Sequence, residues 1–289
     1  MQTIDNFDDV KLLDMANGEK LESWGNYLLI RPDPQIIWKN KSKPALWKKA
    51  NAHYHRSKSG GGEWEYIKNV PKVWQIKYKD LTFNLKPMGF KHTGLFPEQA
   101  VNWDFMMDKI KKANRPIKVL NLFAYTGGAS CACLKAGASV THVDSSKGMV
   151  DWFKENVRSC GMEDYPVRYL IDDVVKFVQR EIRRGNKYDA IIMDPPSYGR
   201  GANGEVWDIE KNLSYLVEIC TEILSDEPLF FLINSYTTGL SSTVLSNLLR
   251  MTVNKKCEGK VTCGEVGIPI KENNLVLPCG IYGRWESNE

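Results

Sequence analysis

The chain has 289 residues, a formal net charge of +4, 43% hydrophobic residues and 26% charged residues. This length exceeds the commonest domain size, so we expect one large domain and a smaller one. No apolar run is long enough to span a bilayer and residues 1–10 carry no secretory signal, which predicts a soluble, cytoplasmic protein without a membrane partner. The seven scattered cysteines match neither a zinc site nor a disulfide framework, so we expect reduced thiols and no bound metal.

The N-terminal part predicts a small β-rich, substrate-binding domain over residues 1–86. Residues 1–21 mix acidic residues and leucines without a clear period, so we expect a loosely attached lead-in there. Runs with strand-like composition between turn residues predict strands at residues 24–30, 35–38, 64–68, 72–78 and 81–85. Together they predict an antiparallel sheet, interrupted by a mobile joint at Gly60–Gly62.

A basic segment lies inside this domain, because residues 34–62 include no Asp or Glu. Its cationic residues alternate with rings, and the two sets are Lys39, Lys41, Lys43, Lys48, Lys49, Arg56 and Lys58, and Trp38, Trp47, His53, Tyr54 and His55. Lysines neutralise phosphates while rings stack on splayed bases, so the segment predicts a single-stranded nucleic-acid surface. We predict substrate contacts from Lys48, Lys49, Tyr54 and Arg56. The alternative is a solvated basic face.

A polar, glycine-spaced loop at residues 89–99 follows and leads into a helix with Pro97 in its first turn. The helix carries apolar residues at helical spacing, at Trp103, Met106, Met107 and Ile110. We interpret this stripe as core packing.

The next segment predicts a nucleotide site. Residues 119–123 form a short apolar run that ends in the turn before Gly127 and Gly128, and residues 129–135 follow as a helix. A second strand, residues 140–143, ends on Asp144, which lies 17 positions after Gly127, near the spacing of a carboxylate that binds a ribose.

This layout has two interpretations. A dinucleotide-binding dehydrogenase would need G-x-G-x-x-G, but Tyr125 and Ala129 occupy the positions of its flanking glycines. The turn therefore favours a ligand without a pyrophosphate, such as S-adenosylmethionine.

Strands and helices then alternate to the end of the chain. We predict strands at residues 167–171, 189–193 and 228–234, helices at residues 149–157, 174–184, 209–224 and 240–251, and a closing hairpin of residues 261–268 and 274–285. This order predicts an α/β fold, a Rossmann-like, doubly wound, seven-stranded sheet over residues 87–289. Its site lies beyond the carboxyl ends of the strands.

Polar residues fall at five of these strand ends, and they are Asn121, Asp144, Asp173, Asp194 and Asn234. Each alone could be a cap or a turn former, but together they would line one crevice. Asp144 is predicted to accept from both ribose hydroxyls, and Asp173 with the Val174 backbone is predicted to bind adenine. Gly127 is predicted to leave room for the methionine part of the cofactor.

The turn Asp194-Pro195-Pro196 is the sharpest local signal. Neither proline has an N–H, so the turn presents acceptors without a backbone donor, which suits a substrate that bears an N–H. We predict Asp194, Pro195 and Tyr198 as catalytic residues, with Tyr198 stacked on a base and Arg200 as a nearby substrate contact.

These residues resemble those of the class I S-adenosylmethionine-dependent methyltransferases, and in particular the bacterial 23S ribosomal RNA methyltransferases. The resemblance covers about residues 87–251 and rests on residues 93–99, 121–128, 172–174 and 194–198. It implies an RNA substrate and ribosomal RNA processing. It also implies a cofactor site formed by Phe96, Gln99, Asn121, Phe123, Tyr125, Asp144, Ser145, Asp173 and Asp194.

Two departures from the family pattern bear on the chemistry. Members that methylate cytosine C5 use a cysteine in the loop after the fifth strand, and residues 234–240 contain none. Ser197 also separates the second proline from Tyr198, where the usual N-methylating signature has the aromatic residue directly. We therefore predict direct transfer to a base nitrogen or an oxygen. The alternatives are a methyltransferase for a small molecule or protein, and a non-catalytic RNA-binding protein.

Overall fold

The structure is a computed structural model that describes residues 1–4, 6–57, 61–201 and 204–288, so Lys58 and Gly60 lie outside the described residues. The chain forms two compact units. The large unit comprises Met1–Gln2, Val101–Val266 and Cys279–Glu289, and the small unit comprises Thr3–Ala100 and Gly267–Pro278. The sequence placed a boundary at residue 86, whereas the small unit extends to Ala100 and includes the tip of the C-terminal hairpin.

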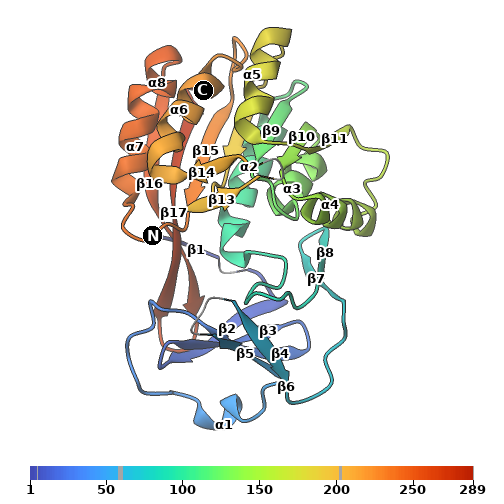
Figure 1. Cartoon of the computed structure of the whole chain (residues 1–289), viewed down its shortest axis with the longest axis vertical. Helices are drawn as coiled ribbons and strands as arrows, with labels where there is room; N and C mark the ends of the chain where they lie inside the picture. The colour runs from blue at the N-terminus through green and yellow to red at the C-terminus, as the bar shows by residue number, and fades with distance from the viewer. Residues whose placement is uncertain (5, 58–60, 202–203, 289) are drawn as a thin grey trace. The chain divides into compact units, whose positions relative to one another are not determined.

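The large unit is built on an eight-stranded sheet in the order β1-β16-β17-β15-β12-β9-β10-β11 (Figure 1). Its strands are β1 (Gln2–Thr3), β9 (Lys118–Leu122), β10 (Ser139–Asp144), β11 (Val167–Ile171), β12 (Ala190–Met193), β15 (Phe230–Ser235), β16 (Gly259–Ile270) and β17 (Leu275–Ser287). Beside the two-residue β1, these are the seven predicted strands. Strands β15, β12, β9, β10 and β11 run parallel, and β17 pairs antiparallel with β15. The α/β fold is therefore confirmed.

Helices cover both faces of this sheet. They are α2 (Ala100–Lys112), α3 (Gly128–Lys135), α4 (Lys147–Ser159), α5 (Val174–Arg184), α6 (Ile209–Thr221), α7 (Ser242–Met251) and α8 (Val253–Lys256). Helices α5, α6 and α7 share one core with Leu120, Ile191 and Phe231, while α3 and α4 contact β10. Because both faces are covered, β12 and β15 are buried along their whole length. Among the described residues, no helix is both long and apolar enough to cross a membrane.

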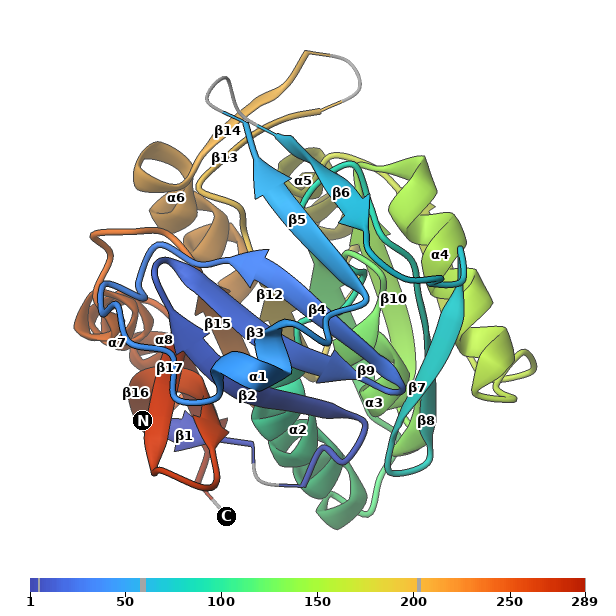
Figure 2. The same cartoon turned by 90° about the horizontal axis from the view of Figure 1, so that it is seen from below.

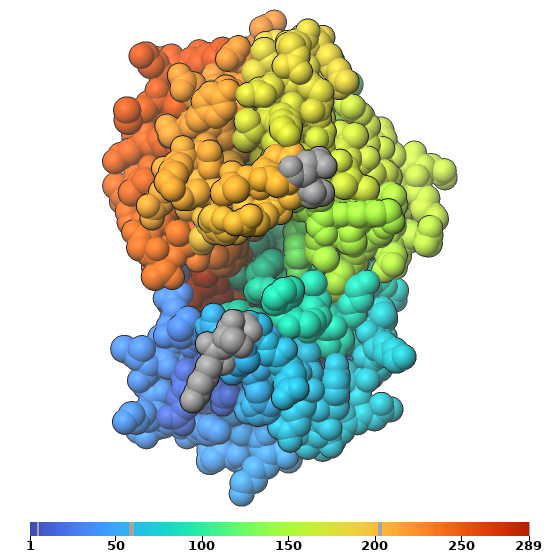
Figure 3. All heavy atoms as spheres, viewed as in Figure 1, coloured from blue at the N-terminus to red at the C-terminus, as the bar shows by residue number. Residues whose placement is uncertain are grey.

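A short ribbon of β13 (Tyr198–Arg200) and β14 (Val206–Asp208) was not predicted. The two strands pair antiparallel, with Gly199 opposite Trp207. The ribbon follows the Asp194-Pro195-Pro196 turn and lies on the face of the large unit that Figure 3 shows. Strands of three residues are too short to display a period, which explains the omission.

The small unit contains a five-stranded sheet in the order β2-β3-β4-β5-β6 (Figure 2). Its strands are β2 (Val10–Ala16), β3 (Glu19–Trp24), β4 (Tyr27–Pro32), β5 (Ala52–Arg56) and β6 (Gly62–Tyr66), and β7 (Trp74–Tyr78) with β8 (Leu81–Leu85) forms a separate ribbon. Two short helices, α1 (Pro44–Trp47) and the 3-10 helix η1 (Pro97–Gln99), complete it. The expected sheet was antiparallel throughout. In the structure β4 and β5 run parallel, so that expectation was only partly right.

Two expectations for this unit were wrong. Residues 1–21 are not a loose lead-in, because they contain β2 and the start of β3 and bury Leu12 and Leu21. A register shift between Leu12 and Asp14 breaks the alternation of β2, which hid the strand. Residues 35–38 form no strand, and their backbone instead accepts hydrogen bonds from Asn17 and Gly18 in the β2–β3 turn.

Asp14 explains how the basic segment is fixed to this sheet. Its buried carboxylate accepts from the backbone N–H of Lys43 at 2.8 Å, the hydroxyl of Ser42 at 2.7 Å and the indole of Trp47 at 2.8 Å. Burial raises the pKa of Asp14, but these hydrogen bonds outweigh it and hold the pKa below its usual value. An ionised Asp14 therefore anchors residues 42–47.

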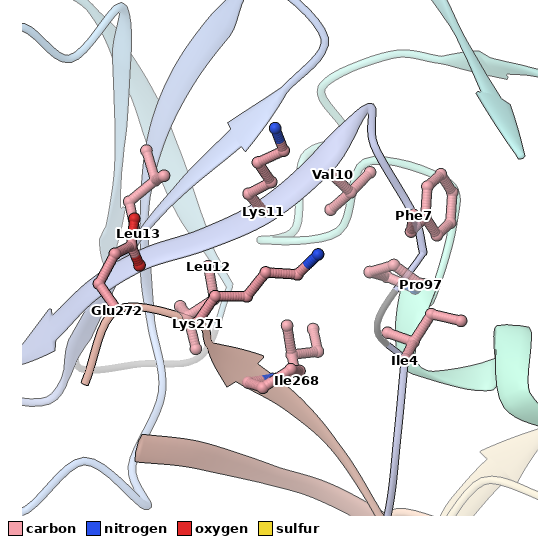
Figure 4. A pocket seen from close by; sticks show the side chains of 11 residues that line it. Ile4, Phe7, Val10, Lys11, Leu12, Leu13, Pro97, Ile268, Lys271 and Glu272 are labelled. Carbon is pink, nitrogen blue, oxygen red and sulfur yellow. The ribbon is translucent and has the colours of Figure 1, made fainter. Parts of the chain in front are cut away.

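A pocket in the small unit lies where its non-contiguous segments meet. Figure 4 shows Ile4, Phe7, Val10 and Pro97 gathered on one side of it, with Lys271 reaching across from the C-terminal hairpin. The apolar side chains of the first ten residues thus contribute to the packing of this unit.

Candidate active site

The strand register brings several predicted residues to one level of the large sheet. Leu122 pairs with Val143 and with Met193, and Met193 pairs with Ile233. The residues that follow this row, Phe123, Asp144, Asp194 and Asn234, therefore stand at the same carboxyl edge of the parallel strands. This edge is the position expected for a ligand in an open α/β sheet.

The turn after β9 has an unusual backbone. Phe123, Tyr125 and Gly127 take left-handed conformations, with φ values of 52°, 52° and 81°. Bulky residues rarely adopt this region, and such strain concentrates at functional sites. Hydrogen bonds of 3.1 Å from Ala124 N to Val143 O and 3.0 Å from Gly127 N to Ala124 O hold the turn. The sequence indicated the turn but not the two aromatic residues that share its left-handed conformation.

Gly127 is required by its neighbour as well as by its φ. A Cβ at this position would overlap the ring of Phe153 in α4. That ring stacks on His142, with centroids 3.9 Å apart and planes 12° apart. The room that Gly127 leaves is therefore filled by Phe153, whereas the sequence interpretation assigned it to the methionine part of the cofactor.

Asp144 is the best-positioned acceptor of this edge. Its Oδ2 accepts from the backbone N–H of Tyr125 at 2.9 Å, and its Oδ1 accepts from that of Ser146 at 2.8 Å. Burial raises the pKa of Asp144 above its usual value, although these two hydrogen bonds lower it. A carboxylate has about four lone-pair sites, so each oxygen can accept once more, as two ribose hydroxyls require. Ser145, between the two anchors, is exposed.

Asn121 and Asp173 have structural partners. Asn121 is buried within β9, and its amide donates to Ser130 Oγ at 2.9 Å. Asp173 caps α5 by accepting from Lys176 N at 2.9 Å. Asn121 thus holds the start of α3 in place. Asp173 is the N-cap of α5, which is one of the two roles that its position at a strand end suggested. Val174 begins α5, so its N–H has no partner within the helix.

Trp207 and Thr237 hold the residues at the end of the Asp194-Pro195-Pro196 turn in place. The indole of Trp207 donates to Pro196 O at 2.7 Å, and its ring meets the Phe123 ring edge-on with centroids 4.7 Å apart. Ser197 Oγ lies 2.7 Å from Thr237 Oγ1 in the loop after β15. Among the described residues, no hydrogen bond reaches the Pro195 carbonyl.

The β13–β14 ribbon thus links the acceptor turn to the turn after β9 and leaves the Pro195 carbonyl as an acceptor. Tyr198 is 56% exposed on this ribbon, and Arg200 is exposed at its end. Trp207 was missed by the sequence interpretation, because a lone Trp in an irregular segment carries no motif.

The loop after β15 lacks a cysteine, but one lies beside it. Asn234 is buried and accepts from Asn102 Nδ2 at 3.1 Å. Ser235 pairs with Ile281, so Cys279 is two residues further along β17, at the level of the loop. A Cβ at the adjacent Gly280 would approach the ring of Tyr236 to 2.9 Å. Cys279 is therefore nearer to the strand ends than its place in the tail suggested.

Three other cysteines, Cys131, Cys133 and Cys220, are fully buried. Burial raises the pKa of each of their thiols, which keeps them protonated and poorly nucleophilic. All seven cysteines are free, as expected, but Cys160, Cys257, Cys263 and Cys279 are only partly buried, so the expectation that most of the thiols are buried was wrong.

The predicted site residues of the small unit lie in different settings. Phe96 is half-buried before η1, with its ring 5.2 Å from that of His92, and Gln99 is buried. Lys48 and Lys49 are exposed just after α1, and Arg56 is exposed at the end of β5. Tyr54 is buried and its hydroxyl donates to Gly89 O at 3.4 Å.

The rings of the basic segment serve mainly as anchors. Trp38 donates to Met15 O at 2.7 Å, and Trp47 is held by Asp14. His53 lies 2.5 Å from Glu19, and His55 lies 2.7 Å from Glu65. Despite these contacts, Trp38 and His55 are exposed, as are Lys39, Lys41, Lys48 and Lys49.

Within the described ranges, His53, His55 and Glu65 are the one group whose geometry could hold a metal ion, since their ligand atoms lie within 4.8 Å of one another. Both histidines already have a glutamate partner.

Comparisons with known proteins find similar sequences and structures. The family model described as S-adenosylmethionine-dependent methyltransferase matches residues 46–241. Ribosomal RNA large subunit methyltransferase K/L of Pseudoalteromonas atlantica is 31% identical over 53% of this chain and 21% of its own length. Ribosomal RNA large subunit methyltransferase K of Neisseria meningitidis is 25% identical over 68% of this chain and 51% of its own length. The chain thus spans about half or less of these relatives.

Solved structures extend the likeness to almost the whole chain. A SAM-dependent methyltransferase from Agrobacterium tumefaciens has a TM-score of 0.94 and 37% identity, with 99% of this chain and 93% of that chain covered. The fold is also shared by SMU.776, a putative methyltransferase complexed with SAH, at a TM-score of 0.73 and 17% identity over 97% of this chain and 76% of that one.

Proposed function

Because the chain belongs to the family of S-adenosylmethionine-dependent methyltransferases, we propose that it methylates RNA, and that this RNA is ribosomal. The proposed target is a base nitrogen. Support for an RNA substrate comes from the relatives, which are named as ribosomal RNA large subunit methyltransferases. Support for nitrogen as the target comes from the acceptor turn of the large unit.

The observation that carries this proposal is the position of Asp194 and Pro195. Asp194 follows the strand row that also ends at Asp144, and the Pro195 carbonyl has no hydrogen-bond partner among the described residues. The two prolines contribute no N–H, so only acceptors face a substrate here. A nitrogen that bears hydrogen satisfies such a turn, whereas a carbon does not.

Bound S-adenosylmethionine supplies an electrophilic methyl group on a positively charged sulfur. Asp144 accepts from the ribose hydroxyls, and Asp173 with the Val174 N–H binds the adenine. Phe123, Tyr125 and Ser145 complete the proposed cofactor site.

On the substrate side, Asp194 and the Pro195 carbonyl accept from the N–H groups of the base nitrogen and orient its lone pair toward the methyl carbon. Tyr198 stacks on the base. As the new N–C bond forms, the bond from the methyl carbon to the sulfonium sulfur would break and leave a neutral thioether. The nitrogen becomes acidic, and the Asp194 carboxylate takes its proton.

In this proposal the small unit binds the RNA. Lys48, Lys49 and Arg56 are exposed and neutralise phosphates, as Arg200 does on the β13–β14 ribbon. A ribosomal RNA substrate places the enzyme in the cytoplasm, where it takes part in ribosomal RNA processing.

The test is to incubate the protein with methyl-labelled S-adenosylmethionine and three substrates in parallel. These are unmodified large-subunit ribosomal RNA transcribed in vitro, a protein extract and a small-molecule extract. We expect the label in RNA. Label in protein or in small molecules would favour the other methyltransferase classes, and cofactor binding without transfer to any of the three would indicate a non-catalytic RNA-binding protein.

A further inference from the structure

A second pocket of the small unit is lined by Pro32, Tyr54, Arg56, Gly61, Phe90, Lys91 and His92, and we call it the Phe90 pocket. Its volume is about 190 Å³. Sites that enclose a whole drug-sized ligand measure roughly 300–1,000 Å³, so this pocket admits one ring of a larger ligand. Its loop belongs to the glycine-spaced segment, and Phe90, Lys91 and His92 of that loop have no part in the proposed chemistry.

This loop is held firmly in place. Its own backbone closes through bonds of 3.1 Å from Lys86 N to Thr93 O and 3.3 Å from Met88 N to His92 O. The neighbouring strands tie it down through Trp64 Nε1 to Met88 O at 2.9 Å and Arg31 to Lys91 O at 3.0 Å, besides the Tyr54 bond to Gly89 O. Its conformation is thus fixed before any ligand arrives, which reduces the entropic cost of binding.

Phe90 is nevertheless 59% exposed at the tip of this loop. A single exposed apolar side chain is common on protein surfaces. Here the ring stands beside a hollow, on a pinned loop and next to cationic side chains, and that combination suits stacking on a nucleobase.

The charges of the Phe90 pocket favour an anion. Neither Arg56 nor Lys91 has a carboxylate partner within the described part of the chain, and Lys91 Nζ donates to Pro32 O at 3.3 Å. Burial lowers the pKa of Lys91, and the nearby cations Lys20, Arg31 and Arg56 lower it further, whereas Asp33 raises it. Cations therefore outnumber carboxylates among the charges that act on Lys91. A phosphate group would offset this excess.

His92 contributes hydrogen-bonding groups rather than charge. Burial and the cations Arg31, Lys91 and Lys20 lower the pKa of His92 to about 3, so its ring is neutral near pH 7. A neutral imidazole offers one N–H donor and one nitrogen acceptor, which can pair with the edge of a base.

We propose that the Phe90 pocket binds one nucleotide of a single-stranded RNA segment. The Phe90 ring stacks on the base, and Arg56 and Lys91 hold the adjoining phosphate. This inference rests on the proposed RNA substrate, and it deepens that proposal by naming where the small unit contacts RNA and in which form.

The test measures binding of a fluorescein-labelled, 12-nucleotide, mixed-sequence single-stranded RNA by anisotropy. Loss of one stacked base should raise the Kd of Phe90→Ala by roughly 5- to 150-fold, while Phe90→Tyr keeps the ring and should stay within about twofold. Arg56→Gln should reduce the log-log salt slope by about 0.7. The matched control is Tyr165→Ala, which removes an exposed ring of the large unit and should change nothing.

A Phe90→Ala variant that binds as tightly as the wild type, or a wild-type protein that binds no RNA, overturns the proposal. Thermal unfolding checks that the exposed substitution leaves the fold intact. Methyl transfer to unmodified large-subunit ribosomal RNA separates the two proposals. If the wild type methylates no RNA, the proposed function fails. If it does, and Phe90→Ala has the same KM, the Phe90 pocket alone fails, since we expect a raised KM with an unchanged kcat.

Discussion

The backbone N–H of Tyr125 donates to Asp144 Oδ2 at 2.9 Å, so the carboxylate at the end of β10 fixes the turn at the end of β9. This bond couples the strained turn to the proposed ribose acceptor. In the proposed function, the same carboxylate accepts from the protein backbone and from the ribose of the cofactor.

We predict that Asp144→Ala weakens S-adenosylmethionine binding at least tenfold, because losing a charged hydrogen bond costs on the order of 1.5–3 kcal/mol. Calorimetry measures this, and Asp151→Ala, which removes a carboxylate of α4 whose side chain is 41% exposed, is the control. Nicotinamide cofactors should not bind to the wild type. An unchanged affinity in Asp144→Ala would mean that the ribose is held elsewhere.

The affinity should also depend on pH. The pKa of Asp144 is raised by burial, and only its ionised form accepts from both hydroxyls. Binding should therefore weaken as pH falls, and at a higher pH than an ordinary aspartate would cause. Calorimetry of the wild type as pH is lowered tests this, and an affinity independent of pH over that range would contradict the assigned role.

Gly127 and Gly137 offer a matched pair for the packing of the turn. Both have positive φ, 81° and 100°, but a Cβ at Gly137 meets nothing within 4 Å, whereas one at Gly127 overlaps Phe153. Gly137→Ala should cost about 1–2 kcal/mol from backbone strain. Gly127→Ala should cost a further 1–3 kcal/mol or so from overpacking. Urea unfolding measures the loss of stability in both variants. Equal losses would show that the Phe153 ring moves aside without an energetic cost.

Acid should destabilise the small unit through Glu22. This buried carboxylate accepts from Arg31 at 2.7 and 3.0 Å. Burial raises the pKa of Glu22, but Arg31 and Lys20 lower it to about 2, against an ordinary value of 4.5. The stabilisation is therefore complete above about pH 4.5 and is lost as pH falls toward 2. Its size is on the order of 3 kcal/mol.

The free energy of unfolding of the small unit is measured by fluorescence at pH values from 5 to 2. Glu22→Gln should remove most of the pH dependence in this range, although it lowers stability at neutral pH because Arg31 then lacks its charged partner. The same acid transition in the variant as in the wild type would contradict the assignment to Glu22.

Methyl transfer should proceed without a covalent link between enzyme and RNA. Cytosine C5 becomes nucleophilic only after a thiolate adds to the ring, and Cys279 is the cysteine of the large unit that lies level with the loop after β15. We predict that Cys279→Ser retains most activity. We also predict that RNA containing 5-fluorocytidine forms no denaturant-resistant complex. A complex that disappears in Cys279→Ser would restore the cytosine-C5 mechanism.

Sequence and structure agree best where burial is uniform. The strands at residues 119–123, 189–193 and 228–234 were predicted because both faces of a parallel sheet are covered, which leaves short apolar runs. The strand ends then followed, and with them Asp144 and Asp194.

The features that the sequence analysis missed depend on contacts that leave no periodic pattern in the sequence. A bulge and the buried Asp14 disguise β2, and three-residue strands carry no alternation. The rings of the basic segment looked suited to stacking, but Trp38 and Trp47 donate to groups of the sheet. Phe90 was not singled out, because its exposure depends on a loop pinned by residues distant in sequence.

The central claim, direct transfer to a base nitrogen at the Asp194-Pro195 turn, is tested most directly by locating the transferred methyl. Wild type and Asp194→Ala are incubated with labelled S-adenosylmethionine and unmodified large-subunit ribosomal RNA, and the RNA is digested to nucleosides for mass spectrometry. We predict a methyl group on a base nitrogen with the wild type, and no transfer by a folded Asp194→Ala that still binds the cofactor. A methyl group on a base carbon, or full activity of Asp194→Ala, would contradict the claim.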